Sequence, residues 1–130
     1  MSTGLHMKPD VVEAAATLLN EMHLAASSLT YAALLTDDGF DVARYPVKSD
    51  GERFAGMASS MQALGEAVAE ELKIGESEYI IIASGKGHVV QRRVPGQELV
   101  LSALFDNDAT VGHALATTKQ FAQKMADLIA

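Results

Sequence analysis

Two carboxylates and an amide lie near the C-terminus, between an apolar segment and a long amphipathic one. Asp106, Asn107 and Asp108 follow the apolar run at residues 98–105 (ELVLSALF), which is typical of a strand, and precede a segment with helical periodicity. Such a group could act as an acid–base pair, bind a cation, or cap the following helix. Capping is the favoured interpretation, because Asn and Asp accept hydrogen bonds from the free amides of a helix's first turn.

The other candidate sites lack the spacing that their chemistry needs. The stretch ASGKG around Lys86 has Ile80 where a nucleotide-binding loop requires its first glycine, so a hairpin turn is predicted there. No two of the four histidines lie three or four residues apart, so a pair of histidines that bind a metal from one side of a helix is excluded. Neither DDGFD (residues 37–41) nor DND (106–108) fits the twelve-residue calcium loop. We therefore expect no metal, no cofactor and no catalytic group, and an interaction module rather than an enzyme.

Composition narrows the class of protein further. The chain has 130 residues, enough for one domain, and its 48% hydrophobic and 21% charged content is ordinary for a folded protein. A net charge of -7 opposes a nucleic-acid partner, and strand alternation would split the one adjacent basic pair, Arg92 and Arg93. Cysteine is absent and no apolar run is long enough to span a membrane, so a cytoplasmic location is expected. Residues 1–9 are expected to be a flexible N-terminus, followed by one domain at 10–130.

Periodicity predicts the order helix, two strands, helix, three strands, helix. The strands are expected at residues 29–36, 40–45, 78–84, 88–94 and 98–105. The first is apolar on both faces and should lie inside the sheet, whereas the second should lie at an edge. Ser49 and Glu52 have the spacing of a capping box at the start of the central helix. Gly75 is the expected left-handed stop of that helix.

The apolar run at residues 79–82 suggests a contact between two copies of the chain. It fills both faces of one strand, although the following strand, with Gln91, is too polar to be deeply covered. At a sheet edge its free backbone groups would be a template for pairing with a second copy, whereas a monomer would keep it as an interior strand. The central helix has an apolar stripe and a small-residue stripe, and the small one would admit a neighbouring helix. The predicted dimer interface comprises Met57, Ala58, Met61, Gly65, Ala69, Tyr79, Ile80, Ile81 and Ile82.

Three segments in this order resemble the Roadblock/LC7 family. They are the hairpin YAALLTDDGFDVARY, the helix FAGMASSMQALGEAVAEEL, and LVLSALFDNDATVGHALATTKQFAQKM, which is similar to the strand, FDN turn and helix of bacterial members paired with small Ras-like GTPases. The resemblance implies an α+β fold, a single α/β/α sandwich of order α-β-β-α-β-β-β-α. In it a five-stranded antiparallel sheet has the central helix on one face and the other two helices on the other. The third strands of two copies would pair into a ten-stranded sheet.

The same resemblance implies a non-catalytic, homodimeric scaffold or regulator that binds a small Ras-like GTPase. Gln62, Glu66 and Glu70 of the central helix are the candidate partner contacts. Two alternatives stay open. Met57 and Met61 suggest a small-molecule sensory module of related fold, with a pocket between the sheet and the central helix. An acid–base enzyme using Asp106 or Asp108 rests on the acidic cluster alone.

Overall fold

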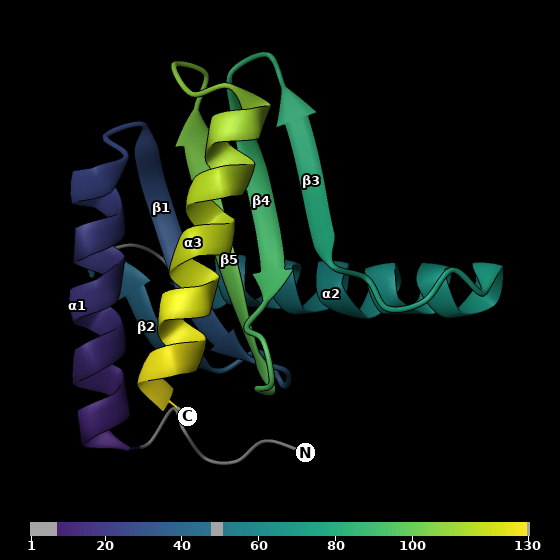
Figure 1. Cartoon of the computed structure of the whole chain (residues 1–130), viewed down its shortest axis with the longest axis horizontal. Coiled ribbons are helices and arrows are strands. Elements are labelled where there is room, and N and C mark those ends of the chain that lie inside the picture. Colours follow the sequence, from purple (N-terminus) through teal and green to yellow (C-terminus); the bar gives the residue numbers. More distant parts are fainter. Residues whose placement is uncertain (1–7, 48–50, 130) are drawn as a thin grey trace.

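A five-stranded antiparallel sheet lies between two layers of helices in the computed structural model, which describes residues 8–47 and 51–129 (Figure 1). The strands lie in the order β2-β1-β5-β4-β3. The predicted α+β fold and its element order are confirmed. Along the chain the elements are α1 (Pro9–Ala25), β1 (Leu29–Thr36), β2 (Asp41–Tyr45), α2 (Gly51–Leu72), β3 (Tyr79–Ser84), β4 (Gly87–Arg93), β5 (Leu99–Asp106) and α3 (Val111–Ile129).

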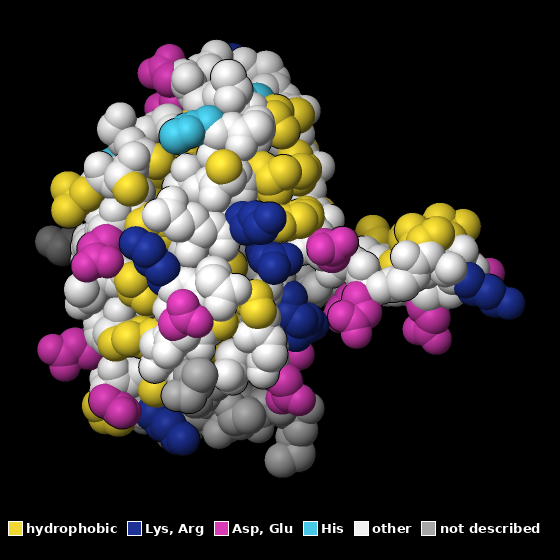
Figure 2. Space-filling model, in the orientation of Figure 1, with side chains coloured by type: hydrophobic (Ala, Val, Ile, Leu, Met, Phe, Trp, Pro, Cys, Tyr) yellow, Lys and Arg dark blue, Asp and Glu magenta, His cyan; other side chains and the backbone are white. Residues whose placement is uncertain are grey.

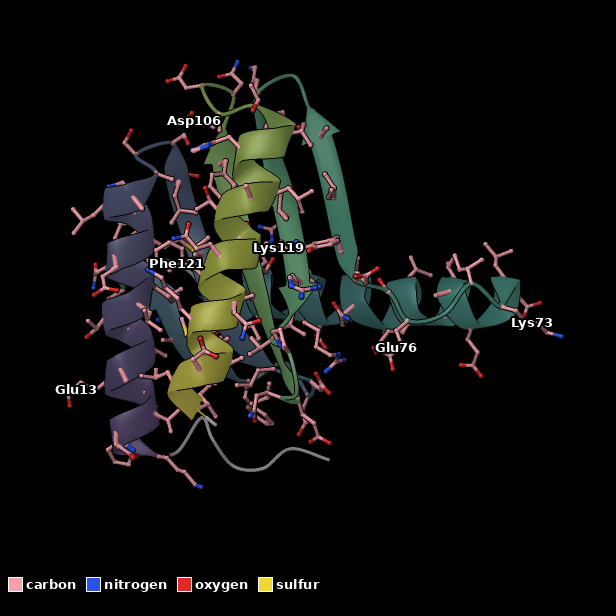
Figure 3. All side chains as sticks on the ribbon, viewed as in Figure 1. Glu13, Lys73, Glu76, Asp106, Lys119 and Phe121 are labelled. Atoms are coloured by element: carbon pink, nitrogen blue, oxygen red, sulfur yellow. The ribbon has the colours of Figure 1, made fainter. Side chains whose placement is uncertain are left out.

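Strand β1 has helices on both of its faces, which explains its unbroken apolar sequence. Ala32 and Leu34 point into the larger core, which α1 and α3 complete, and Phe121 of α3 is buried in it (Figure 3). Ala33 and Leu35 point to the opposite face, where they pack against α2. Because successive strand residues alternate between faces, an apolar run on both predicts an interior strand. That position and the edge position of β2 are both confirmed.

Helix α2 ends in a hydrogen-bonded cap centred on Lys73. Lys73 is left-handed, with φ 55°, and its N–H donates to the carbonyl of Glu70 at 3.1 Å. The N–H of Ile74 then reaches back to the carbonyl of Ala69, also at 3.1 Å. These two bonds satisfy carbonyls that the helix end leaves free. Gly75 also has positive φ but lies beyond this cap, so the prediction that it stops the helix is wrong.

The start of α3 is capped by Thr110. Its Oγ1 accepts a hydrogen bond from the N–H of His113 at 3.0 Å. Asp106 instead accepts one from the N–H of Asp108 at 2.9 Å, and the side-chain amide of Asn107 donates to the carbonyl of Gly85 at 3.2 Å. The predicted capping role of residues 106–108 is therefore wrong: these residues close the turn after β5, and the helix begins only after it.

Two further predictions concern the ends of segments. Ser49, the proposed first member of the capping box, lies outside the described residues, while Glu52 is exposed in the first turn of α2. Of the predicted flexible segment at 1–9, only Lys8 and Pro9 are described, and Pro9 begins α1. Over the described ranges, no helix has the length and apolar character that crossing a membrane requires.

The turn between β3 and β4 depends on a glycine with no room for a side chain. Gly87 is buried, and a Cβ there would lie 2.7 Å from the carbonyl oxygen of Phe105 on β5. A Cβ added to Gly85, two residues earlier, would meet no atom within 4 Å. The ASGKG stretch is thus a hairpin turn, as predicted, and its second glycine allows β4 to approach β5.

Candidate functional site

Helix α2 crosses the back of the sheet and projects well beyond its edge strand (Figure 1). On its sheet-facing side near the start, Ala55 and Ala58 are buried against β1. On another side, Met57, Leu64, Val68 and Leu72 are exposed, and Leu64 retains 66% of its accessible surface. Steps of seven, four and four residues place these side chains along one side of a helix. Figure 2 shows apolar side chains along one side of the projecting segment and acidic ones along the opposite side.

Strand β3 forms one edge of the sheet. In the described part of the chain it pairs with β4 alone, so its other edge carries unpaired backbone groups. Ile81 and Ile82 are half exposed, one on each face of the strand. The predicted edge position of this apolar run is therefore confirmed, and the monomer alternative of an interior strand is not what this chain shows.

The small residues of α2 are covered by this chain itself. Ala58 and Ala69 are buried, and a Cβ added to Gly65 would lie only 2.9 Å from Cδ1 of Ile80 on β3. Small side chains let the helix approach the sheet closely, so this stripe is used within the protomer. The prediction that it faces a second copy needs correction: the larger apolar stripe, with Leu64 and Val68, is the exposed one.

A buried amide fixes the contact between α2 and β4. Gln91 has no exposed surface, and its side-chain amide donates to the carbonyl of Ala58 at 2.8 Å and to Oε1 of Gln62 at 3.2 Å. These bonds satisfy the buried amide nitrogen, which would otherwise be costly to bury, while Oε1 of Gln91 has no hydrogen-bond partner among the described residues. One prediction is corrected here: Gln62 is buried rather than available to a partner. Strand β4 is covered only in part, since Gln91 is fully buried while Arg92 and Arg93 keep accessible surface.

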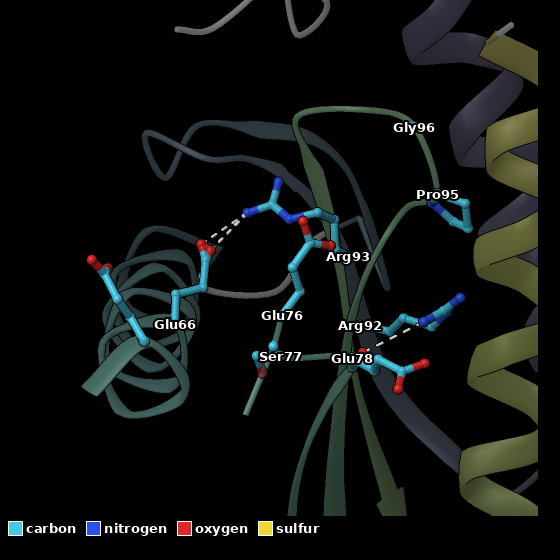
Figure 4. A pocket seen from close by; sticks show the side chains of 10 residues that line it. Glu66, Glu76, Ser77, Glu78, Arg92, Arg93, Pro95 and Gly96 are labelled. Carbon is cyan, nitrogen blue, oxygen red and sulfur yellow. Dashed lines mark hydrogen bonds and ion pairs between the residues drawn. The ribbon is translucent and has the colours of Figure 1, made fainter. Parts of the chain in front are cut away.

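Arg93 joins three elements through its guanidinium group. It donates to both carboxylate oxygens of Asp37, in the turn between β1 and β2, at 2.8 and 3.0 Å. It also donates to both oxygens of Glu66 on α2, at 3.2 and 3.0 Å (Figure 4). Burial alone would lower the pKa of Arg93, but hydrogen bonds and charges from Asp37 and then Glu66 outweigh it, so the pKa is raised.

The three candidate partner contacts thus differ in their surroundings. Gln62 is buried, the carboxylate of Glu66 is held by Arg93, and Glu70 is exposed. Glu70 lines a groove of about 570 Å³ with Glu66 and the residues of the following loop (Figure 4). Strand alternation does split the basic pair, since Arg93 reaches α2 and Arg92 lies on the opposite face of β4. The sequence carried no signal for the salt bridges of Arg93, because its partners lie 56 and 27 positions away.

An apolar groove of about 650 Å³ runs between the projecting part of α2 and β3. Its lining includes Leu64, Val68 and Ile82, which belong to the exposed surfaces of these two elements. The sensory alternative expected a pocket between the sheet and the helix. The groove does lie between α2 and the edge strand β3, with Met61 in its lining, whereas Ala55 and Ala58 bring α2 into direct contact with β1.

Acidic and histidine side chains form no metal centre within residues 8–47 and 51–129, where no group of three or more could hold an ion. The carboxylate of Asp106 accepts a hydrogen bond from the backbone N–H of Asp108. The exposed surfaces described above offer apolar side chains, an unpaired strand edge and charged groups for contact with a partner.

A family model for the Roadblock/LC7 domain matches residues 15–95, and the chain belongs to this family. The gliding protein MglB from Thermus thermophilus is 19% identical, with a TM-score of 0.80 over 93% of this chain and 92% of that one. Myxococcus xanthus MglB is 15% identical, with a TM-score of 0.83 over 95% and 92%. Profilin IB from Acanthamoeba castellanii is 15% identical, with a TM-score of 0.60 over 88% and 98%. No curated protein sequence matches the chain. At these identities the solved structures share the fold.

Proposed function

We propose that this protein is a non-catalytic homodimeric scaffold or regulator that binds a small Ras-like GTPase. The observation that carries the proposal is the uncovered apolar side of α2 beside the unpaired edge of β3. Membership of the Roadblock/LC7 family supports it, as does the similarity in fold to MglB.

The sheet face behind β3 supports a dimer built from these two elements. Ile82, Val89 and Leu104 are cross-strand neighbours on the face that α2 covers, yet each keeps accessible surface because α2 crosses the sheet elsewhere. If two β3 edges pair about a two-fold axis, the projecting end of each α2 extends over the other copy's sheet. The arrangement covers both apolar surfaces at once and satisfies the free backbone groups.

The mass in solution tests the dimer. Light scattering coupled to size exclusion should give about twice the 13.8 kDa of one chain. Ile81→Lys should dissociate or aggregate the protein, because a charge at paired strands would lose its water. A stable monomer at micromolar concentration, or an unchanged dimer for Ile81→Lys, would remove β3 from the interface.

A GTPase partner is tested separately. The purified protein would be mixed with a small Ras-like GTPase encoded beside its gene, loaded with GDP or with a GTP analogue, and complex formation measured. We expect tighter binding to one nucleotide state, and Glu70→Lys should weaken it, since Glu70 is the exposed member of the three candidates. Absence of binding in both states would contradict this part of the proposal while leaving the dimer intact.

A further inference from the structure

A third groove lies on the face of the sheet opposite α2. It has a volume of about 480 Å³ and lies over the exposed side of α3, beside Arg92 of β4. Lys119 stands on the side of α3 that faces β4 and β3 (Figure 3), and Figure 2 shows Lys and Arg side chains gathered between α3 and the projecting part of α2. The lining residues are Arg92, Ala116, Lys119, Gln120, Gln123 and Lys124.

The three cations of this groove have no carboxylate partners. Among the described residues, Arg92, Lys119 and Lys124 form no ion pair, whereas Arg93, the neighbour of Arg92, pairs with both Asp37 and Glu66. The groove's lining includes no acidic side chain among those residues, and the carboxylate of Asp127 near its end accepts from Gln123 at 3.0 Å. A chain with net charge -7 thus has one surface of concentrated positive charge.

The cations are spread along the groove rather than aimed at one point. The guanidinium of Arg92 lies 4.9 Å from the ring centre of Tyr79 on β3, and the ammonium of Lys124 lies 4.7 Å from that of Phe121 on α3. Each is thus held by a different ring on a different element. A compact anion needs donors that converge, while a row of carboxylates matches separated cations. Nε of Arg92 is buried and has no acceptor among the described residues.

We propose that this groove binds an acidic segment of a partner protein, with Arg92, Lys119 and Lys124 facing its carboxylates. The surface shares no residue with the apolar groove between α2 and β3, although Arg92 also lines the groove that contains Glu70. Charge complementarity of this kind raises association rates and weakens as salt screens it.

The test uses a fluorescein-labelled peptide of repeating Leu-Glu-Glu-Ala, followed by anisotropy, with a matched peptide in which glutamine replaces glutamate. We expect the acidic peptide to bind, the glutamine peptide not to bind, and rising salt to weaken the complex. Lys119→Glu should weaken binding by about tenfold or more. Lys86→Glu is the matched control: it makes the same charge change at an exposed position in the turn between β3 and β4, and should shift binding by less than about twofold.

Five results would overturn the proposal. Absence of peptide binding or equal binding of the two peptides would do so, and so would an equal loss in Lys86→Glu, which would indicate net charge alone. Displacement of the peptide by inorganic phosphate at matched ionic strength would indicate a compact anion site. Alternatively, the protein would sediment with phosphatidylserine vesicles and fail to bind the peptide. If Lys119→Glu then abolished sedimentation, the surface would be assigned to a membrane. Both lysines are exposed, so the variants should keep the melting temperature of the parent protein.

Discussion

Replacing Leu64 by alanine should weaken the proposed dimer strongly without harming the fold. The change removes three carbon atoms, worth about 2.4 kcal/mol when fully buried. Leu64 keeps 66% of its surface exposed in the protomer, so about two thirds of that energy, roughly 1.6 kcal/mol, is available to association. A two-fold axis repeats the contact, so the dimer should lose about 3 kcal/mol and its Kd should rise by about two orders of magnitude.

Sedimentation velocity across a dilution series would measure the dimer Kd of Leu64→Ala and of the parent chain. Leu24→Ala is the matched control for loss of an exposed leucine, since Leu24 on α1 is 83% exposed and lies on an element outside the proposed interface. We expect its Kd to equal that of the parent. If Leu64→Ala associates as tightly as the parent chain, or if Leu24→Ala weakens association equally, the assignment of the exposed α2 stripe to the dimer is refuted.

Three further predictions concern contacts within one protomer. Gly87→Ala should lower the free energy of unfolding by about 1 to 3 kcal/mol in urea titration, because its Cβ would lie 2.7 Å from a backbone oxygen, while Gly85→Ala should change it by less than about 0.5 kcal/mol. Gln91→Ala should cost about 1 to 3 kcal/mol by the same assay, since two buried acceptors lose their donor; an unchanged midpoint would mean that the amide is not needed there. Arg93→Ala should cost about 1 kcal/mol, less in high salt, with Arg53→Ala, exposed at the start of α2, as control. Because the pKa of Arg93 is raised, its contribution should be present throughout the neutral and moderately alkaline range and be lost only as the pH rises through that raised value.

Local patterns predicted the elements well, because each depends on residues close together in the chain. The alternation of β1 and the edge position of β3 follow from which faces are apolar. The sequence did not show which of the two stripes of α2 packs on the sheet and which stays exposed. Both Ala58 and Leu64 suit a packed surface, and only the placement of Ile80 beside Gly65 shows which stripe the sheet occupies.

The buried polar contacts were also beyond reach of the sequence. Gln91 reads as a solvent-facing residue of a polar strand, and Gln62 as an exposed one on a helix. Each is buried because the other is present: the donor on β4 meets its acceptor on α2 across 29 positions of chain. The cap of α3 was missed for a local reason. Three acidic or amide residues precede Thr110, and any of them has the chemistry of a cap; the geometry of the turn after β5 selects the threonine.

The ion pairs of Arg93 have a mechanical consequence for the projecting helix. Helix α2 is held to the sheet at Ala58 and projects beyond it, and its last buried residue is Ala69. Glu66 lies between the anchor and the free end, and the guanidinium that holds it also holds Asp37. A partner that pulls on the projecting end of α2 therefore also pulls on the turn between β1 and β2, through Arg93. To tilt away from Arg93, the helix must move that turn or break a salt bridge.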